Sequence, residues 1–325
     1  MKRFLKLIFR FFLVLISACF FFFFWASSST LDESNYAKLI EVENKVVPEN
    51  DSIFSIVTYN IGYLSGMTNN LAVESSKELY DDNLEKVISE VKKLNPDIMA
   101  FQEIDFNASR SYNVNQEEEI SKLGFNYRAQ TINWDKRYLP FPYWPISMQY
   151  GKVVSGQSVI SKYPLKEQQR VVLQRVVDEP FHREAFYLER LAQVVKVLLN
   201  GKEVVLINIH LEAFDKQTRV KQFEEVLDIF NKYKDTYPTI LLGDFNSKAR
   251  DKNAVIQKIF GMKAIGNAAS EMHNLGNTYD SKNPSERIDY IFYTKKSIEY
   301  ISGKVLNQFG QASDHLPIEM KFRLK

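Results

Sequence analysis

The sequence of 325 residues contains one cysteine and only four histidines. The cysteine, Cys19, lies in an apolar N-terminal segment, so no disulfide bond can form within the chain. This absence excludes a disulfide-stabilised fold but does not select a cellular compartment. Because histidine is scarce, the adjacent pair Asp314 and His315, a few residues before the C-terminus, requires an explanation.

An excess of basic residues is lacking as well. Lysine and arginine together number 42 against 40 acidic residues, which gives a formal net charge of +2. Four of these basic residues lie in the first ten positions, and removing them leaves 38 basic against 40 acidic residues. Proteins that bind duplex DNA derive most of their non-specific affinity from a basic surface. The composition therefore gives no indication of such a surface, whereas 45% hydrophobic residues suffice for a sizeable core.

The N-terminal segment, residues 1–30, is predicted to lie outside the globular fold. Its basic start is followed by an apolar run, Phe11–Ala26, which reaches membrane-spanning length when residues 4–9 are added. We expect this segment to be an uncleaved membrane anchor. Since basic flanks stay cytoplasmic, the rest of the chain is expected to be extracytoplasmic, on the periplasmic or outer face. The alternatives are a cleaved signal peptide, which would give a secreted protein, and a lipoprotein with its lipid on Cys19.

The remainder is predicted to consist of a polar linker, residues 31–51, and one folded domain, residues 52–325. Strand-like segments dominate this domain, and helices are interspersed without strict alternation. This pattern favours an α/β fold in which two sheets pack together with helices outside. Strands are expected at 52–59, 97–103, 158–161, 170–177, 188–199, 203–210, 239–242, 288–293 and 318–323, and helices at 81–94 and 220–233.

Polar side chains recur where the apolar strands begin or end. They are Asn60, Gln102, Glu103, His210, Asp244, Asn246, Asp289, Asp314 and His315. Open sheets gather functional groups at one rim in this way.

The chemistry of this set is coherent. Asn60, Glu103 and Asp314 offer hard oxygen ligands suited to Mg²⁺ or Mn²⁺. Asp244 is suited to position or deprotonate a water molecule, with Asn246 holding an oxygen of the substrate.

The histidines complete this set. His210 and His315 are able to donate to phosphate oxygens, and Asp289 to fix the tautomer of a histidine through its other ring nitrogen. Because neighbouring residues on a strand point in opposite directions, Asp314 and His315 are not expected to pair with each other. A metal, two imidazoles and a water-orienting acid together predict an enzyme that hydrolyses phosphodiesters.

The motifs "TYNIGY", "QE", "NIHLEAF", "GDFNS", "RIDYIF" and "SDHLP", in this order, resemble the endonuclease/exonuclease/phosphatase superfamily. That group includes deoxyribonuclease-I-like nucleases, inositol polyphosphate 5-phosphatases and neutral sphingomyelinases. The resemblance covers about residues 53–322 and implies a four-layered α/β/β/α sandwich, two packed mixed sheets flanked by helices, with a divalent metal. It also implies that Asn60, Glu103 and Asp314 lie at the metal, Asp244 and Asn246 at the nucleophile, His210 at the phosphate, and Asp289 behind His315.

Four further residues are less clearly functional. Arg110 and Arg219 either contact substrate phosphate or are exposed charges. His182 and His273 have no motif around them and are interpreted as ordinary surface or core residues.

The substrate is only partly indicated. Residues 132–156 are rich in aromatic residues and proline and are interpreted as a loop that docks on a membrane, stacks on substrate, or only covers one end of the sandwich. With the anchor and near-neutral domain, they favour a phospholipid or sphingomyelin-type headgroup. The alternatives are an extracytoplasmic nuclease acting on DNA or RNA, a catalytically silent membrane-tethered binding protein, and a phosphatase acting on inositol phosphates. The sequence predicts no oligomeric state.

Overall fold

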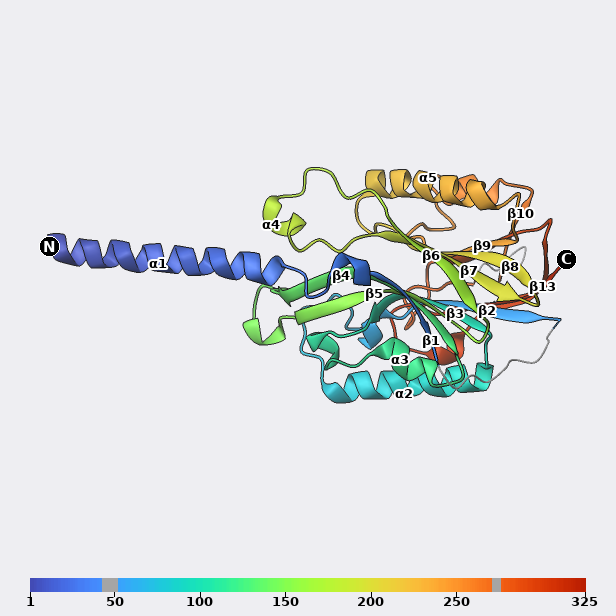
Figure 1. Cartoon of the computed structure of the whole chain (residues 1–325), viewed down its shortest axis with the longest axis horizontal. Coiled ribbons are helices and arrows are strands. Elements are labelled where there is room, and N and C mark those ends of the chain that lie inside the picture. The colour runs from blue at the N-terminus through green and yellow to red at the C-terminus, as the bar shows by residue number, and fades with distance from the viewer. Residues whose placement is uncertain (43–51, 271–275) are drawn as a thin grey trace.

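The computed structural model describes residues 1–42, 52–270 and 276–325 (Figure 1). His273 and the second half of the predicted linker lie outside these ranges. Within them, a long N-terminal helix, α1 (Lys2–Ser27), projects from a layered globular part (Figure 1).

Two mixed sheets form the centre of the globular part. The seven-stranded sheet has the order β1-β4-β5-β3-β2-β13-β12 and the six-stranded sheet the order β10-β11-β9-β8-β7-β6. The strands of the first sheet are β1 (Ala37–Glu41), β2 (Phe54–Asn60), β3 (Ile98–Asp105), β4 (Tyr127–Leu139), β5 (Gly151–Ser161), β12 (Ile298–Val305) and β13 (Ile318–Leu324). Those of the second are β6 (Leu165–Val172), β7 (Leu191–Leu199), β8 (Lys202–His210), β9 (Thr239–Asp244), β10 (Ile265–Asn267) and β11 (Asp289–Thr294).

Three apolar layers hold these sheets and the helices together. The inner faces of the two sheets pack on each other through fully buried aliphatic residues such as Ile56 and Leu206. The helices α2 (Lys77–Leu94) and α3 (Gln116–Ser121) cover the outer face of the seven-stranded sheet. On the other side, α5 (Lys216–Tyr233) and α6 (Gln257–Phe260) cover the six-stranded sheet. The predicted four-layered α/β/β/α sandwich is therefore confirmed.

The structure corrects the interpretation of residues 31–51 as a linker. Residues 37–41 form β1, which pairs antiparallel with β4 at the edge of the seven-stranded sheet. Within β1 the alternation of apolar and polar residues is too short to predict a strand. The strand is also exposed, since only Ile40 among its five residues is half-buried.

The aromatic segment 132–156 is also different from the predicted loop. Most of it belongs to β4 and β5, which pair with each other, and only residues 140–150 connect the two strands. The prolines that suggested a loop all lie in this connection, where no strand ladder needs their missing amide hydrogens.

The helix α1 is continuous and apolar, and by length and composition it is able to cross a membrane or to serve as a signal sequence. Its C-terminal end packs on the globular part, where Ala26 is fully buried and the ring of Phe22 lies 5.7 Å from that of Tyr138. Polar contacts follow directly, because Thr30 and Leu31 donate to the buried carboxylate of Asp135. The helix is thus joined to the sandwich by specific contacts.

Candidate active site

The polar residues predicted at strand ends meet at one rim of the sandwich. In the six-stranded sheet, His210 on β8 pairs in register with Asp244 on β9, and Asp244 pairs with Asp289 on β11. In the other sheet, Asn60 on β2 pairs with Gln102 on the parallel strand β3, one residue before Glu103. The two rows face each other, because the sheets are packed with these ends together.

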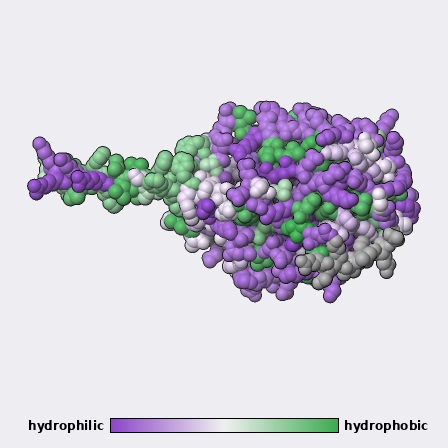
Figure 2. All heavy atoms as spheres, viewed as in Figure 1, coloured by the Kyte–Doolittle hydropathy of each residue, from purple (hydrophilic) through white to green (hydrophobic). Residues whose placement is uncertain are grey.

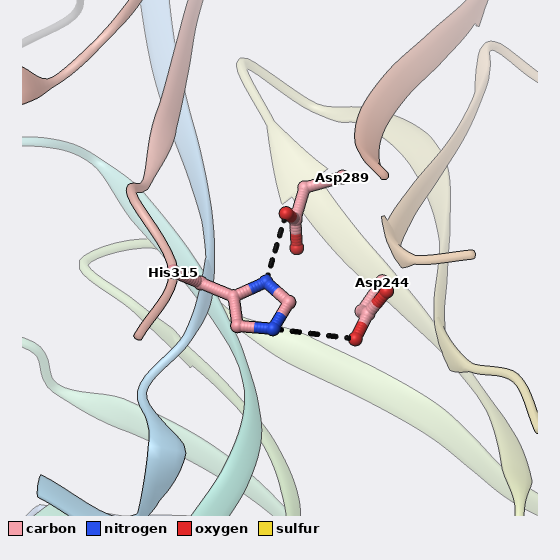
Figure 3. Close-up of side chains that lie close together, drawn as sticks. All are labelled: Asp244, Asp289 and His315. Carbon is pink, nitrogen blue, oxygen red and sulfur yellow. Dashed lines mark hydrogen bonds and ion pairs between the residues drawn. The ribbon is translucent and has the colours of Figure 1, made fainter. Parts of the chain in front are cut away.

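His315 lies between two buried carboxylates (Figure 3). Its Nδ1 is 2.9 Å from Asp289 Oδ2, and its Nε2 is 3.9 Å from Asp244 Oδ2. Burial alone would lower the pKa of His315, but the charges of Asp289 and Asp244 outweigh burial and raise this pKa well above its ordinary value. A ligand atom from each of the three residues lies within 4.8 Å of the others, so this group is also able to hold a cation.

Asp244 is fixed by neutral donors on both oxygens. The backbone N–H of Asn246 donates to Oδ1 over 2.8 Å, and the Nδ2 of Asn60 donates to Oδ2 over 3.0 Å. Burial, with the nearby charge of Asp289, raises the pKa of Asp244 to about 7. A carboxylate with this pKa is able to accept a proton near neutral pH and to release it again.

Glu103 and Asp314 form a second acidic group in the same cleft. Both carboxylates accept from the Nδ2 of Asn69, at 2.9 Å for Glu103 and 3.2 Å for Asp314. Burial and the charge of Asp314 raise the pKa of Glu103. Two half-buried carboxylates that share one donor are favourable for a divalent cation, which neutralises both.

Asn60 stands between the two acidic groups rather than within the second. Its Nδ2 bonds Asp244, while its Oδ1 accepts from the backbone N–H of Gly62 at 3.1 Å. The role of Asn60 as a metal ligand therefore stays a prediction.

The local backbone is shaped to bring these groups together. Glu103 has a φ of 51° and lies where the pairing of β3 with β5 is interrupted by a bulge, so its side chain is turned out of the regular ladder. Gly243 precedes Asp244 on β9, and a Cβ there would come within 2.0 Å of the Ile209 carbonyl oxygen. The close approach of β8 and β9 at the rim therefore requires glycine in "LLGDFN".

His210 is held by an arginine that the sequence did not single out. The Arg190 Nη1 lies 2.6 Å from the His210 Nε2, and both side chains are buried. Burial and the charge of Arg190 lower the pKa of His210 well below its ordinary value. Neutral His210 thus accepts from Arg190 at Nε2, and its Nδ1 has no hydrogen-bond partner among the residues described. Arg190 is also paired with Glu212, whose Oε2 lies 3.5 Å from the Arg190 Nε. At this point of the cleft the positive charge is therefore on Arg190, not on His210, and Glu212 offsets part of it.

Two residues of the site, Arg190 and Asn69, belong to no sequence motif. Arg190 directly precedes β7, and Asn69 lies in the connection after β2. Only their position in space marks them. What marks Arg190 is that it is buried beside a histidine at the end of a strand. This proximity follows from the pairing of β7 with β8, which the sequence does not specify.

Most of these side chains open into one cleft of about 780 Å³. Of the predicted residues, the cleft is lined by Glu103, His210, Arg219, Asp244, Asn246, Asp314 and His315. Asn60 and Asp289 lie behind this lining and bond to it. The guanidinium of Arg219 donates to the carbonyl oxygens of Glu212 and Ala213, at 2.7 and 2.8 Å, at the edge of the cleft.

Arg110 is not brought to this cleft, contrary to the prediction that it binds substrate. It makes a bidentate ion pair with buried Asp105, with Nη2 2.7 Å from Oδ1, and stacks on the ring of Tyr63. Arg110 is therefore the counter-ion of Asp105, which is fully buried and requires one.

Replacing Arg110 with Met should lower the free energy of unfolding by about 3 kcal/mol, because the buried Asp105 would lose its partner. Denaturant unfolding of the full-length protein in mild detergent measures this loss, with exposed Arg250→Met as the matched control. Loss of activity at unchanged stability would instead restore a role for Arg110 in substrate binding.

The comparisons with known proteins agree with this geometry. A sequence profile described as "Endonuclease/Exonuclease/phosphatase family" matches residues 57–315. A UPF0294 protein of Vibrio cholerae is 27% identical over 128 residues, 39% of this chain, and the match spans only 42% of that protein.

Solved structures share the fold. A mannosyl-6-phosphatase of Bacteroides thetaiotaomicron has a TM-score of 0.59 at 16% identity, covering 83% of this chain and 99% of that one. D. rerio TDP2 complexed with a single-strand DNA product has a TM-score of 0.58 at 18% identity, covering 84% and 100%. At these identities the likeness concerns the fold alone.

Proposed function

The chain belongs to the endonuclease/exonuclease/phosphatase family, and on this premise we propose that it is a membrane-tethered, divalent-metal-dependent hydrolase of phosphodiesters. The observation that carries the proposal is the cleft in which Asp244 and His315 face the Glu103–Asp314 pair. Family members are phosphoesterases and nucleases, so hydrolysis of a phosphoester is the activity that this site serves.

Glu103 and Asp314 would hold a Mg²⁺ or Mn²⁺ ion. Their oxygens are hard ligands, and their proximity leaves negative charge that a divalent cation neutralises. When bound, such an ion polarises a phosphoryl oxygen and offsets charge that develops there.

The proton chemistry falls to Asp244. Its raised pKa suits it to take a proton from the attacking water, while the backbone N–H of Asn246 and the amide of Asn60 hold its carboxylate in place. The side chain of Asn246 lines the cleft beside it, and its Nδ2 donates to the Leu211 carbonyl oxygen at 2.9 Å and to Asp244 Oδ2 at 3.3 Å. To bind an oxygen of the substrate, Asn246 would exchange one of these two bonds.

The phosphate would be held by two cationic groups. His315, kept protonated and oriented by Asp289, supplies an N–H from one side. Arg190 supplies a permanent charge from the other, next to His210. Cations placed where negative charge grows lower the barrier because they need no rearrangement during the reaction.

A membrane lipid headgroup is the substrate class that we favour, with the domain on the extracytoplasmic side. Two of the basic residues that line the cleft are paired with acids, since Lys248 lies 2.5 Å from Glu286 and Arg183 lies 3.8 Å from Glu179, and Lys216 and Arg219 line it as well. This mixed rim offers little to the continuous backbone charge of a nucleic acid. It supports a small headgroup over DNA or RNA.

The full-length protein in detergent should hydrolyse bis(p-nitrophenyl) phosphate with Mg²⁺ or Mn²⁺ and lose this activity on chelation with EDTA. Restoring the metal should restore the rate. An inactive wild-type protein that still binds the ester would instead support the alternative of a silent binding protein.

A substrate panel then decides the class. Phospholipid and sphingomyelin vesicles, single- and double-stranded DNA, RNA and inositol phosphates are each assayed with wild type and Asp244→Asn. Activity on nucleic acid alone would overturn the lipid preference and favour the nuclease.

A further inference from the structure

We propose that five exposed apolar side chains at the base of α1 form a membrane-docking surface that holds the cleft at the bilayer. This aromatic collar consists of Phe141, Tyr143, Trp144 and Ile146 from the β4–β5 connection and Phe181 from α4 (Phe181–Glu184). Tyr143, Trp144, Ile146 and Phe181 are 68%, 77%, 62% and 74% exposed. Large apolar side chains gathered in this way are unfavourable in water and mark a surface that is covered by something else.

The collar is continuous with α1. The ring of Phe23 on α1 lies 5.7 Å from Phe181 and equally far from Phe186, and Phe22 packs on Tyr138 near the end of β4, just before the β4–β5 connection. Figure 2 shows the apolar side chains of the helix running into the end of the globular part. A bilayer that surrounds α1 would therefore reach the collar without a gap.

The composition of the collar fits the boundary between headgroups and acyl chains. Tryptophan and tyrosine prefer this depth because their rings combine an apolar body with a polar edge. The occupant that the geometry favours is thus a lipid surface.

The junction between helix and domain is built to fix an orientation. Lys136 Nζ donates to the Ser27 carbonyl oxygen, the Arg137 N–H donates to that of Ser28, and Thr30 is bound to Asp135. These bonds tie the residues that follow α1 directly to β4. The angle of the domain to the membrane is therefore set by the fold.

The same segment that meets the helix also forms a wall of the cleft. Val176, Glu179, Arg183, Tyr187 and Arg190 line the cleft, while Phe181 and Phe186 between them contact α1. Trp134 joins both sides, because it lines the cleft and its Nε1 donates to the Phe186 carbonyl oxygen at 3.0 Å. Docking of the collar would thus place this wall of the cleft next to the lipid headgroups.

The use of this surface in catalysis rests on the function proposed above, whereas the docking itself does not. The single native cysteine allows a direct test of the docking. In a Cys19→Ser background, a nitroxide is attached to Trp144→Cys and, as the matched control, to Ile301→Cys on β12, and each protein is placed in nanodiscs of phosphatidylcholine and phosphatidylglycerol.

We expect the nitroxide at position 144 to be accessible to oxygen and shielded from a water-soluble nickel complex, as in lipid. The nitroxide at position 301 should be accessible to nickel. Shielding of position 144 from both reagents would indicate contact with another protein chain and overturn the proposal. Equal accessibility of both positions to nickel would overturn it as well.

A second variant separates docking from chemistry. The triple substitution Tyr143→Ser, Trp144→Ser and Ile146→Ser should reduce hydrolysis of lipid in vesicles while leaving the rate on bis(p-nitrophenyl) phosphate in detergent unchanged. Unchanged lipid hydrolysis would contradict the role of the collar. If wild type itself fails on the soluble ester, the proposed function fails, and the nitroxide result still decides the docking.

Discussion

Replacing His315 with alanine should lower kcat/KM for bis(p-nitrophenyl) phosphate by about 10²- to 10³-fold, the range expected when one fixed donor to the developing charge is lost. The imidazole is buried at the wall of the cleft, bonded to Asp289 through Nδ1, and directed towards Asp244 through Nε2. No other protonated imidazole lies in the cleft, among the residues described, because His210 is kept neutral beside Arg190. Water has no comparable fixed donor to offer in place of this side chain.

The matched control is His182→Ala, since His182 is exposed on α4 and does not line the cleft. This variant should retain the wild-type rate in detergent. Asp289→Asn adds a test of orientation, because it keeps the shape of the side chain but loses the charge that holds His315 protonated. Wild-type kcat/KM in His315→Ala would show that the proposed mechanism is wrong.

The sequence predicted the rim of the sandwich well because each strand there is a buried apolar run that stops at a polar residue. Asn60, His210 and Asp244 follow such runs directly, and parallel pairing then brings their ends to one side. The adjacent Asp314 and His315 were predicted to work apart. In the structure, Asp314 accepts from Asn69 while His315 contacts Asp289.

The features that the sequence did not predict depend on contacts between distant segments. β4 was not predicted because its aromatic residues and the prolines that follow it are typical of a loop. Its strand conformation depends on pairing with β5, which lies later in the sequence. Arg110 was interpreted as either a phosphate ligand or an exposed charge, because an arginine near a motif has no visible partner in the sequence. Its partner, Asp105, is only five residues away, but its burial is a property of the fold.

Arg190 was not predicted as a site residue, because its position depends on strand register. Nothing in "LERLAQ" distinguishes it from a surface charge, and its value arises when β7 pairs with β8 and sets Leu191 opposite His210. A charge that is placed by strand register is visible only when the register is known. Residues of this kind therefore limit what motifs alone can assign in this family.

Replacing Glu103 with glutamine should weaken Mn²⁺ binding and lower kcat/KM by about 10³-fold, since a bound ion contributes several kcal/mol of charge stabilisation. Glutamine has the same shape and can still accept from Asn69, so the cleft should keep its form. The amount of free Mn²⁺, measured by electron paramagnetic resonance during titration, reports the affinity directly. Glu224→Gln, on the exposed face of α5, is the matched control.

A measurement without metal distinguishes a ligand from a structural residue. Glu103 and Asp314 repel each other when no cation lies between them, and burial strengthens this repulsion. Glu103→Gln removes one of the two charges, so the metal-free variant should unfold at the same temperature as wild type or at a higher one, and Mn²⁺ should stabilise it less. A variant that is less stable without metal, yet binds Mn²⁺ as tightly as wild type, would place the cation elsewhere, and the group of Asp244, Asp289 and His315 would then be the site to test.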